Sequence, residues 1–198
     1  MENIAGIVLC GGESKRMGSD KGLLERDGKK WVQLVADKLG FLNIPVIISI
    51  NEHQLELYSE LFPVNQLIID DIDVRGPLRG LLSAFQKYPE QDFLLMACDL
   101  VDMDEITLRN LLDHYTSKKE FDFFVYHEDH AEPFCAIYTA RGLKPVLEKA
   151  RLHSLEKFSF QNILDEGNTL RIPITQKSSF LNYNTIPGHH QESGQEKN

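Results

Sequence analysis

Apolar and polar residues alternate along the chain in blocks whose lengths suit strands and helices in turn. Continuous apolar runs of strand length occur at five places. The segments between them carry apolar residues at the spacing of three and four that is typical of an amphipathic helix. The predicted strands are Ile4–Leu9, Pro45–Ile50, Gln66–Ile69, Asp92–Ala97 and Phe121–Tyr126. The predicted helices between them are Trp31–Leu39, Gln54–Leu61, Pro77–Tyr88 and Ile106–Tyr115.

The second half of the chain is less regular. Pro133–Tyr138 predicts a strand that runs antiparallel at an edge of the sheet, and Thr169–Ile174 predicts a short strand. Helices are expected at Arg141–Lys149 and Leu155–Leu164. Continuous apolar strands separated by helices favour a parallel sheet that is covered on both faces. We therefore predict an α/β fold, a single-domain three-layer α/β/α sandwich with a mostly parallel, Rossmann-like sheet and an antiparallel edge.

The composition fits a globular protein and narrows the classes of partner. With 198 residues and 42% hydrophobic residues, we expect one domain over residues 1–187 and a disordered polar tail over residues 188–198. The formal net charge of -9 argues against nonspecific binding to nucleic acid or to an anionic membrane. Cys10, Cys98 and Cys135 lack the paired spacing of a zinc site. Reduced core cysteines and no leader-like or membrane-length segment predict a cytoplasmic location.

The segment from Leu9 to Lys21 has the composition of a phosphate-binding loop. Its Gly11–Gly12 pair follows the first predicted strand, where glycine lets the backbone turn sharply and approach a ligand closely. Arg16 and Lys21 add two cations within the same loop. Backbone N–H groups in such a turn hold phosphate oxygens. The ones expected to do so here belong to Leu9, Cys10, Gly11 and Gly12. The loop therefore predicts a nucleotide site.

The spacing within this loop differs from that of the two common phosphate loops. It lacks the glycine spacing and the Lys-Ser/Thr pair of the P-loop, and it lacks the Gly-x-Gly-x-x-Gly of dinucleotide-binding folds. It instead matches Leu-x-Gly-Gly-x-Ser-x-Arg-Met-Gly-x-Asp-Lys at every fixed position from Leu9 to Lys21. By this pattern the chain resembles the nucleotidyltransferase superfamily and, within it, the molybdenum cofactor guanylyltransferases.

Asp99 follows the predicted strand Asp92–Ala97, at the end where open α/β sheets bind ligands. A carboxylate beside phosphate groups suits Mg²⁺, which prefers oxygen ligands. The resemblance likewise implies that Asp99 binds the metal and the nucleotide. The family usually continues with Cys-Asp-x-Pro, whereas Leu100 and Val101 stand here, which leaves the geometry of the turn open. Asp104 is expected to cap the helix that follows.

Two other nucleotide contacts that the resemblance implies leave alternatives open. The family places an asparagine after the second strand to read the guanine base. Asn51 is the candidate here, but its spacing makes Ser49 the first position of the family's pair, and Asn51 equally suits a helix cap. The family also places an aspartate shortly before Gly-Pro-Leu-x-Gly. The interval to Gly76 leaves Asp70 and Asp71 as candidates, with Asp71 slightly favoured.

Two late segments extend the resemblance over most of the chain. Residues 132–138 resemble a family strand with a proline near its start, with Glu132 where Gln or His is common. Residues 182–187 resemble the family's closing Asn-x-Asn-Thr-Pro, with one residue inserted before the proline. By that resemblance Asn184, together with Asn182, reaches the metal and the acceptor.

The resemblance implies transfer of GMP from GTP to molybdopterin, the molybdenum cofactor, with release of pyrophosphate and with Mg²⁺ as cofactor. In-line transfer needs no protein nucleophile, so Arg16, Lys21 and Asp99 would act by holding charge. GTP and molybdopterin are the expected partners, with a molybdoenzyme or its chaperone as a further one. One alternative is a related transferase that uses CTP or a sugar-phosphate acceptor, although Gly11–Gly12 in place of Ala-Ala-Gly favours guanine. The other is a nucleotide-binding regulator without catalysis.

Overall fold

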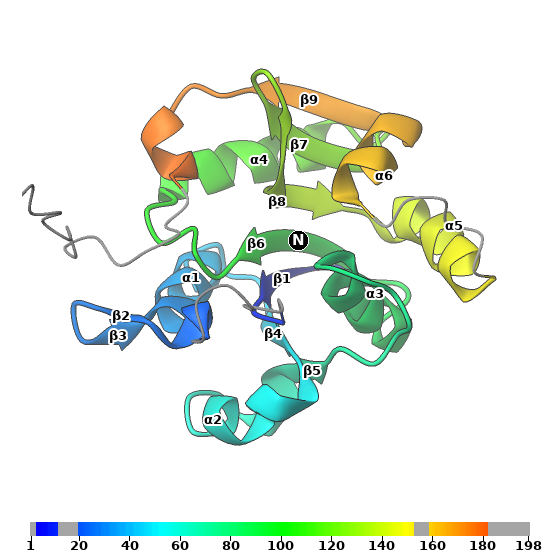
Figure 1. The fold of residues 1–198 in the computed structure, drawn as a ribbon. Coiled ribbons are helices and arrows are strands. Elements are labelled where there is room, and N and C mark those ends of the chain that lie inside the picture. The colour runs from blue at the N-terminus through cyan, green and yellow to red at the C-terminus, as the bar shows by residue number, and fades with distance from the viewer. Residues whose placement is uncertain (1–2, 12–19, 153–158, 182–198) are drawn as a thin grey trace, which may run out of the picture.

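A seven-stranded sheet forms the centre of the molecule (Figure 1). The computed structural model describes residues 3–11, 20–152 and 159–181. The strands lie side by side in the order β5-β4-β1-β6-β8-β7-β9. In chain order they are β1 Ile4–Leu9, β4 Val46–Ile50, β5 Leu67–Ile69, β6 Asp92–Ala97, β7 Phe123–His127, β8 Ala131–Tyr138 and β9 Thr169–Pro173. The strands predicted from the apolar runs are thus confirmed, with small shifts at their ends.

The sheet is mostly parallel, as predicted. β1 runs parallel to β4 and β6, β4 to β5, and β7 to β9, whereas β8 runs antiparallel to both β6 and β7. The predicted antiparallel strand is therefore confirmed, but its predicted place at an edge is wrong. The short turn between His127 and Ala131 can join only antiparallel neighbours, and it inserts β8 between β6 and β7. Pro133 is tolerated inside the sheet because the pairing of β8 with β7 is irregular there.

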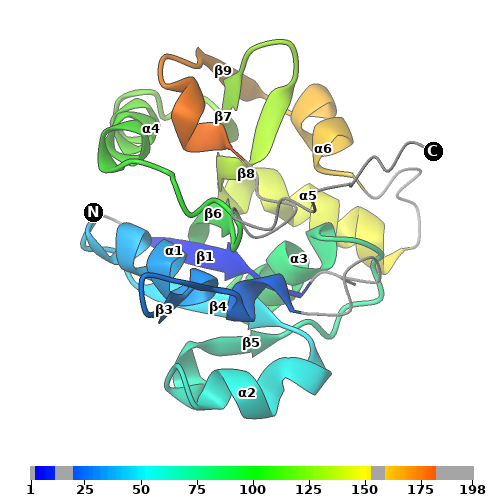
Figure 2. The same ribbon diagram turned by 60° about the vertical axis from the view of Figure 1, so that its left-hand side comes forward.

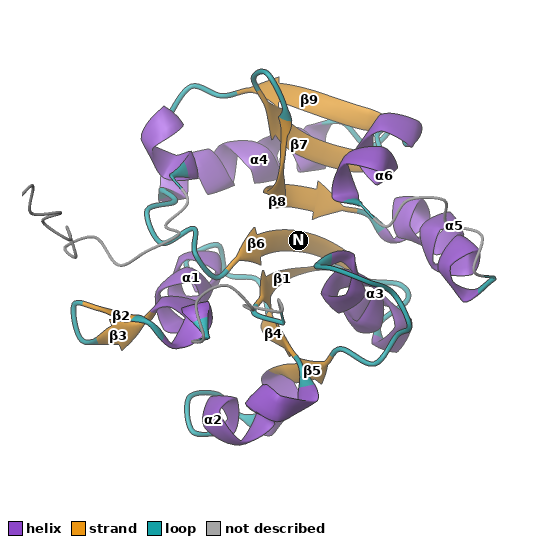
Figure 3. Ribbon diagram, in the orientation of Figure 1, coloured by secondary structure: helices purple, strands orange, loops and turns teal. Residues whose placement is uncertain are grey.

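Helices cover both faces of the sheet and make three layers (Figures 2 and 3). The helices α1 and α4 pack on one face, α3, α5 and α6 pack on the other, and α2 lies beside the edge strand β5. The bounds are α1 Trp31–Gly40, α2 Leu55–Ser59, α3 Leu78–Lys87, α4 Glu105–Ser117, α5 Ala140–Arg151 and α6 Phe160–Glu166. The predicted α/β/α sandwich is confirmed. Of the predicted helix 155–164, the first four residues lie outside the described residues.

Successive side chains of a strand point to opposite faces of the sheet, and they pack into two separate apolar clusters, one on each face. On β1, Ile4 and Val8 pack toward α1, while Ala5, Ile7 and Leu9 pack toward α3. All six residues of β1 are buried, as expected for a strand covered on both faces. The three cysteines are buried and none of them forms a disulfide, in agreement with the prediction of reduced core cysteines. Within the described ranges, no helix has both the length and the apolar content needed to cross a membrane.

A small hairpin, β2 (Glu25–Arg26) and β3 (Lys29–Lys30), was not predicted. Its turn residues Asp27 and Gly28 both have positive φ, 54° and 77°, the conformation that favours an Asp-Gly pair in tight hairpins. Arg26 reaches from this hairpin to the carboxylate of Asp102, with an N–O distance of 2.7 Å. The hairpin is thereby held near the loop that follows β6.

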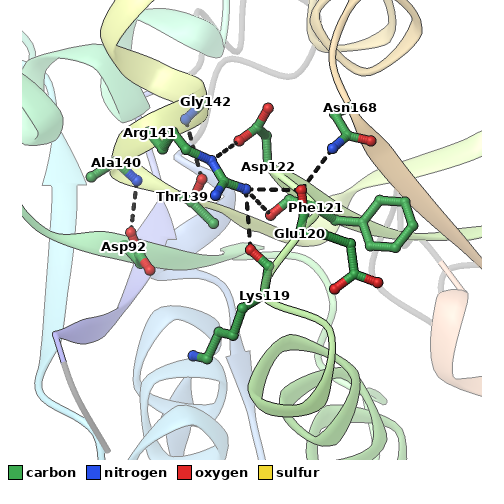
Figure 4. Close-up of polar contacts among 10 residues, drawn as sticks. All are labelled: Asp92, Lys119, Glu120, Phe121, Asp122, Thr139, Ala140, Arg141, Gly142 and Asn168. Carbon is green, nitrogen blue, oxygen red and sulfur yellow. Dashed lines mark hydrogen bonds and ion pairs between the residues drawn. The ribbon is translucent and has the colours of Figure 1, made fainter.

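A polar network closes the amino-terminal edge of the sheet, the edge at which β6 begins (Figure 4). The guanidinium of Arg141, at the start of α5, donates to the Asp122 carboxylate and to the carbonyl oxygens of residues 119–121. Asp92 accepts a hydrogen bond of 2.7 Å from the backbone N–H of Ala140. These contacts join the start of α5 to the turn before β7 and satisfy main-chain groups there. Since this edge is opposite the carboxyl ends of the parallel strands, its role is structural.

Candidate functional site

The carboxyl ends of β1, β4, β5 and β6 meet at one edge of the sheet, and each is followed by a predicted site residue. Backbone hydrogen bonds continue the pairing past the strand ends. Cys10 N donates to Ser49 O at 2.9 Å, Asp70 N to Ile50 O at 2.8 Å, and Cys98 N to Leu9 O at 3.3 Å. The structure therefore brings together the described part of the glycine loop with Asn51, Asp70 and Asp99, as the strand order of an open α/β sheet requires.

Gly11 lies against the carboxylate of Asp70. A Cβ atom built at Gly11 would overlap the Oδ2 atom of Asp70 and would come 3.6 Å from the backbone nitrogen of Asn51. Glycine is thus required here because no room remains for a side chain. Leu9 and Cys10 are buried just before it. Gly12 and Arg16, also predicted to bind the nucleotide, lie outside the described residues.

Of the two candidate aspartates, Asp70 is the one beside the loop. It is only 5% exposed, and its Oδ1 accepts a hydrogen bond of 2.7 Å from the Ser49 hydroxyl. Burial raises the pKa of Asp70 to about 6, against the opposing influence of the Ser49 hydrogen bond and of the Arg79 charge. Asp71, which was slightly favoured, is exposed and donates its backbone N–H to Ser83 on α3 at 3.0 Å.

Gly80 allows α3 to approach this edge closely. A Cβ at Gly80 would overlap the hydroxyl of Ser49 and would lie 3.0 Å from Leu9 Cδ2. The hydroxyl of Ser49 is therefore enclosed by α3 on one side and by Asp70 on the other. This close packing connects α3, β4 and the end of β5 into one rigid support for Gly11.

Asn51 carries a buried side-chain oxygen without a donor. Asn51 precedes the 3₁₀ turn Glu52–Gln54 in the arrangement of a capping box with Gln54, but its side-chain oxygen makes no hydrogen bond of normal geometry there. Its backbone N–H donates to Oε1 of Gln54 at 2.8 Å. No hydrogen-bond donor in the described part of the chain reaches Oδ1 of Asn51. A buried acceptor left unpaired is costly, and such atoms occur where a ligand completes the site. The Ser49 hydroxyl donates to Asp70 and is enclosed by Gly80, so Asn51 is the open acceptor of the two candidates.

Lys21 and Asp99 form an ion pair across the site. The Nζ atom of Lys21 lies 3.2 Å from Oδ2 of Asp99, and the side chains are 25% and 16% exposed. Asp99 stands in a turn closed by a hydrogen bond of 3.2 Å from Leu100 N to Ala97 O. The turn therefore forms although Leu100 and Val101 replace the family's residue and proline. Both of these residues are buried.

The donor chemistry at Asp99 fits a hard divalent cation that takes most of its ligands from phosphate and water. Mg²⁺ is often held by only one or two carboxylates together with substrate phosphates. No group of three or more His, Cys, Asp or Glu side chains within residues 3–11, 20–152 and 159–181 is arranged to hold a metal by itself. Asn184, the second predicted ligand, lies outside those ranges, as does Asn182.

Three residues that the sequence did not single out hold the loop at its second end. The carboxylate of Asp20 accepts hydrogen bonds from Gly22 N at 2.9 Å, Tyr58 Oη at 3.0 Å and Gln54 Nε2 at 2.5 Å. Gln54 Nε2 also donates to the carbonyl oxygen of Cys10 at 3.1 Å. The one sequence signal was the Asp-Lys pair that ends the loop motif. Gln54 and Tyr58 lie too far along the chain for local patterns to indicate these contacts.

Two other acids lie at the same edge, beyond β6. Asp104 caps α4 as predicted, accepting from Thr107 N at 2.7 Å. Burial opposes its ionised form, but hydrogen bonds from Ser179 and Thr107 hold the pKa of Asp104 below its usual value. Glu132 is half-buried at the start of β8, and burial raises the pKa of its carboxyl. Because β8 is antiparallel, its start lies beside the carboxyl end of β6.

Comparisons with known proteins agree with this architecture. Residues 6–166 match the model of the MobA-like NTP transferase domain. The chain is 29% identical over 193 residues, covering 93% of this chain and 89% of the relative, to a probable molybdenum cofactor guanylyltransferase of Pelotomaculum thermopropionicum. It is 32% identical over 147 residues, 73% of this chain and 71% of the relative, to a molybdenum cofactor guanylyltransferase of Pseudomonas fluorescens.

A solved structure has the same fold. The molybdopterin-guanine dinucleotide biosynthesis protein A of Archaeoglobus fulgidus is similar with a TM-score of 0.75 and 24% sequence identity, covering 92% of this chain and 93% of that protein. The seven-stranded sheet and its two helical layers are therefore shared with a protein of known structure.

Proposed function

The chain belongs to the MobA-like NTP transferase family and is a nucleotidyltransferase, and on this premise we propose that it transfers GMP from GTP to molybdopterin. The products would be pyrophosphate and the guanine dinucleotide form of the molybdenum cofactor. Two relatives are named for this activity, and their matches cover 93% and 73% of this chain, which supports the same reaction here.

The proposal of guanine as the base rests on the Oδ1 atom of Asn51, which has no hydrogen-bond donor in the described part of the chain. This oxygen is buried, and the backbone nitrogen of Asn51 lies beside Gly11, so we place the base of a nucleotide bound at the loop next to Asn51. Guanine presents two kinds of donor on one edge, a ring N–H and an exocyclic amino group. A buried amide oxygen can accept a hydrogen bond from either of these donors. A base without such a donor would leave the oxygen buried and unpaired, so the site should bind that base much more weakly.

The reaction would be an in-line displacement at the α-phosphorus of GTP. A phosphate oxygen of molybdopterin forms the new bond to the α-phosphorus, and the bond to the β-phosphate bridging oxygen breaks, so pyrophosphate leaves. The backbone N–H groups of Leu9 to Gly12, with Lys21 and Arg16, would hold the triphosphate and balance the charge that develops on the leaving group. No side chain need form a covalent bond.

Asp99 would hold the divalent cation, for which we propose Mg²⁺, and Asn184 is a further ligand by its place in the closing motif. When bound, this cation supplies charge neutralisation to the phosphates. The Nζ atom of Lys21 lies 3.2 Å from Oδ2 of Asp99, so the residue that would hold the cation and the residue that would bind the phosphates stand side by side.

Two alternatives share the geometry. A related transferase would use CTP or a sugar-phosphate acceptor. A regulator would bind the nucleotide without turnover. The intact Lys21–Asp99 pair favours an enzyme over a regulator, because a chain that had lost catalysis would be expected to have lost some of these residues. We further propose a cytoplasmic location and delivery of the product to a molybdoenzyme or its chaperone.

The test is pyrophosphate release with Mg²⁺ and each of the four NTPs, with and without molybdenum-loaded molybdopterin. Release with GTP that depends on the pterin would support the proposal. Release with CTP in place of GTP would reject the base, and release with a sugar phosphate in place of the pterin would reject the acceptor. Binding of GTP without release under any of these conditions would identify the regulator.

A further inference from the structure

We propose that Asp20 is a positioning residue, which fixes Lys21 for the phosphates and couples this lysine to the base side of the site through Gln54. The inference rests on the proposed function to the extent that Lys21 binds phosphate. Asp20 itself is not expected to contact the substrate, because its carboxylate is occupied by protein donors.

The donors to Asp20 come from two separate parts of the chain. One is the backbone N–H of Gly22, for which Asp20 is the N-cap of the 3₁₀ turn Lys21–Leu23. The others are the Gln54 amide and the Tyr58 hydroxyl, from the turn and helix after β4. Asp20 therefore holds the last residues of the loop against the segment that follows β4.

The three donors to the Asp20 carboxylate are all uncharged. Tyr58 is fully buried, and burial raises the pKa of its hydroxyl far above the usual range, so it remains a donor throughout the physiological range. Lys21 forms an ion pair with Asp99, which follows a different strand from the partners of Asp20. Asp20 thus sets the place of the lysine backbone, and Asp99 sets the direction of its side chain.

Close packing makes this arrangement intolerant of movement. A Cβ at Gly22 would overlap the hydroxyl oxygen of Tyr58 and lie 3.4 Å from Oδ1 of Asp20. The backbone after Lys21 consequently lies directly against the buried tyrosine. Any displacement of Asp20 moves Lys21, since the two residues are adjacent and the turn is already in contact with its support.

Gln54 connects Asp20 to the base side. Its Nε2 donates both to Asp20 and to the carbonyl oxygen of Cys10, while its Oε1 accepts from the backbone N–H of Asn51. Both ends of the amide are therefore committed. In an Asp20→Asn variant, an amide nitrogen replaces one acceptor oxygen and faces a hydrogen-bond donor. If the Gln54 amide turned over to accept from this nitrogen, it would lose the hydrogen bond from the backbone N–H of Asn51. The substitution keeps the size of the side chain but breaks the network.

The experiment is a double-mutant cycle on ligand affinity by titration calorimetry, with Mg²⁺ and two probes, GTP and inorganic tripolyphosphate. We expect Asp20→Asn to weaken both ligands about tenfold, the size of a lost hydrogen bond to a charged group. Lys21→Ala should weaken them by at least as much. In the Lys21→Ala background, Asp20→Asn should cost less than about twofold, because residues that act through one another are not additive.

Tyr58→Phe removes one donor and should weaken both ligands in the same direction but less. Thr139→Ala is the control, because it removes the side-chain N-cap of α5 at the opposite edge of the sheet. It should lower thermal stability without changing either affinity.

The outcomes separate this inference from the proposed function. Additive losses in the cycle, or full affinity in Asp20→Asn, would overturn the positioning role and leave the proposed function standing. If the wild type bound tripolyphosphate but not GTP, the guanine assignment would fail while the cycle on tripolyphosphate still decided the role of Asp20. If the wild type bound neither ligand, both proposals would be overturned.

Discussion

The Asp70 carboxylate fills the space into which a side chain at position 11 would project, so the glycine of the loop is fixed by an acid that follows a different strand. The two residues follow β1 and β5, which are separated in the sheet by β4. Phosphate loops are usually explained by the ligand that approaches their glycines. Here the protein itself requires the glycine, before any ligand binds.

This overlap predicts that Gly11→Ala is destabilising. We expect the free energy of unfolding to fall by about 1–3 kcal/mol, the usual cost of overpacking a buried position, and GTP affinity to fall with it. Urea unfolding and titration calorimetry measure the two effects. Gly40→Ala is the matched control, since nothing lies within 4 Å of a Cβ there, and it should leave both quantities nearly unchanged. Equal behaviour of the two variants would contradict the argument.

The pKa of Asp70 predicts a pH dependence of stability. Burial raises this pKa from 3.8 to about 6, so the contribution of Asp70 is fully present below about pH 4 and is lost as pH rises through 6. The loss is on the order of 3 kcal/mol, and the opposing influences of Arg79 and Asp71 are already included in this pKa. Asp70→Asn is neutral at every pH and should gain stability relative to the wild type between pH 4 and pH 7. Parallel stability curves for the two proteins over that range would refute the assignment.

The Lys21–Asp99 pair predicts a separation of activity from stability. Lys21→Ala and Asp99→Ala should each abolish pyrophosphate release. The free energy of unfolding should change by no more than about 1 kcal/mol, because partly exposed ion pairs contribute little. Arg141→Ala should do the reverse, lowering stability while leaving release intact, because its hydrogen bonds lie at the opposite edge of the sheet. Near wild-type release in either site variant would reject the roles given to Lys21 and Asp99.

The unpaired oxygen of Asn51 predicts a variant that gains stability and loses selectivity. Asn51→Ala removes a buried acceptor that has no donor in the described structure, so the protein without nucleotide should be at least as stable as the wild type. The preference for GTP over other NTPs should fall by about tenfold or more, the size of one lost base contact in a polar site. Asn110→Ala serves as the control, since its amide donates to Tyr126 at 2.9 Å and its loss should cost stability alone. Unchanged base preference in Asn51→Ala would show that another residue reads the base.

The sequence was sufficient for the strands, because a strand buried on both faces leaves a continuous apolar run such as Ile4–Leu9. It misplaced β8, because a proline in a strand usually marks an edge, whereas Pro133 lies in an irregular stretch inside the sheet. It missed the hairpin at Asp27–Gly28, because the strands on either side are short and charged and lack the alternation that normally accompanies this turn.

At the site, the sequence located the acids that end strands but could not choose between neighbours. Asp70 and Asp71 differ by one residue, and the pleat directs one of them inward and the other to solvent. The support around Asp20 was not predictable, because its partners Gln54 and Tyr58 are 34 and 38 residues away and meet it only after β1 and β4 have paired. Contacts of this kind are set by packing between elements and leave no local pattern.

The interior position of β8 also separates two parts of the chain within the sheet. Strands β5, β4, β1 and β6 all come from residues before 98, whereas β8, β7 and β9 all come from residues after 122, so the junction between β6 and β8 divides the sheet into two contiguous stretches of chain. The described loop, Asn51, Asp70 and Asp99 all belong to the first stretch or directly follow it. A substitution confined to the later stretch can therefore alter that half of the sheet without replacing any of these residues.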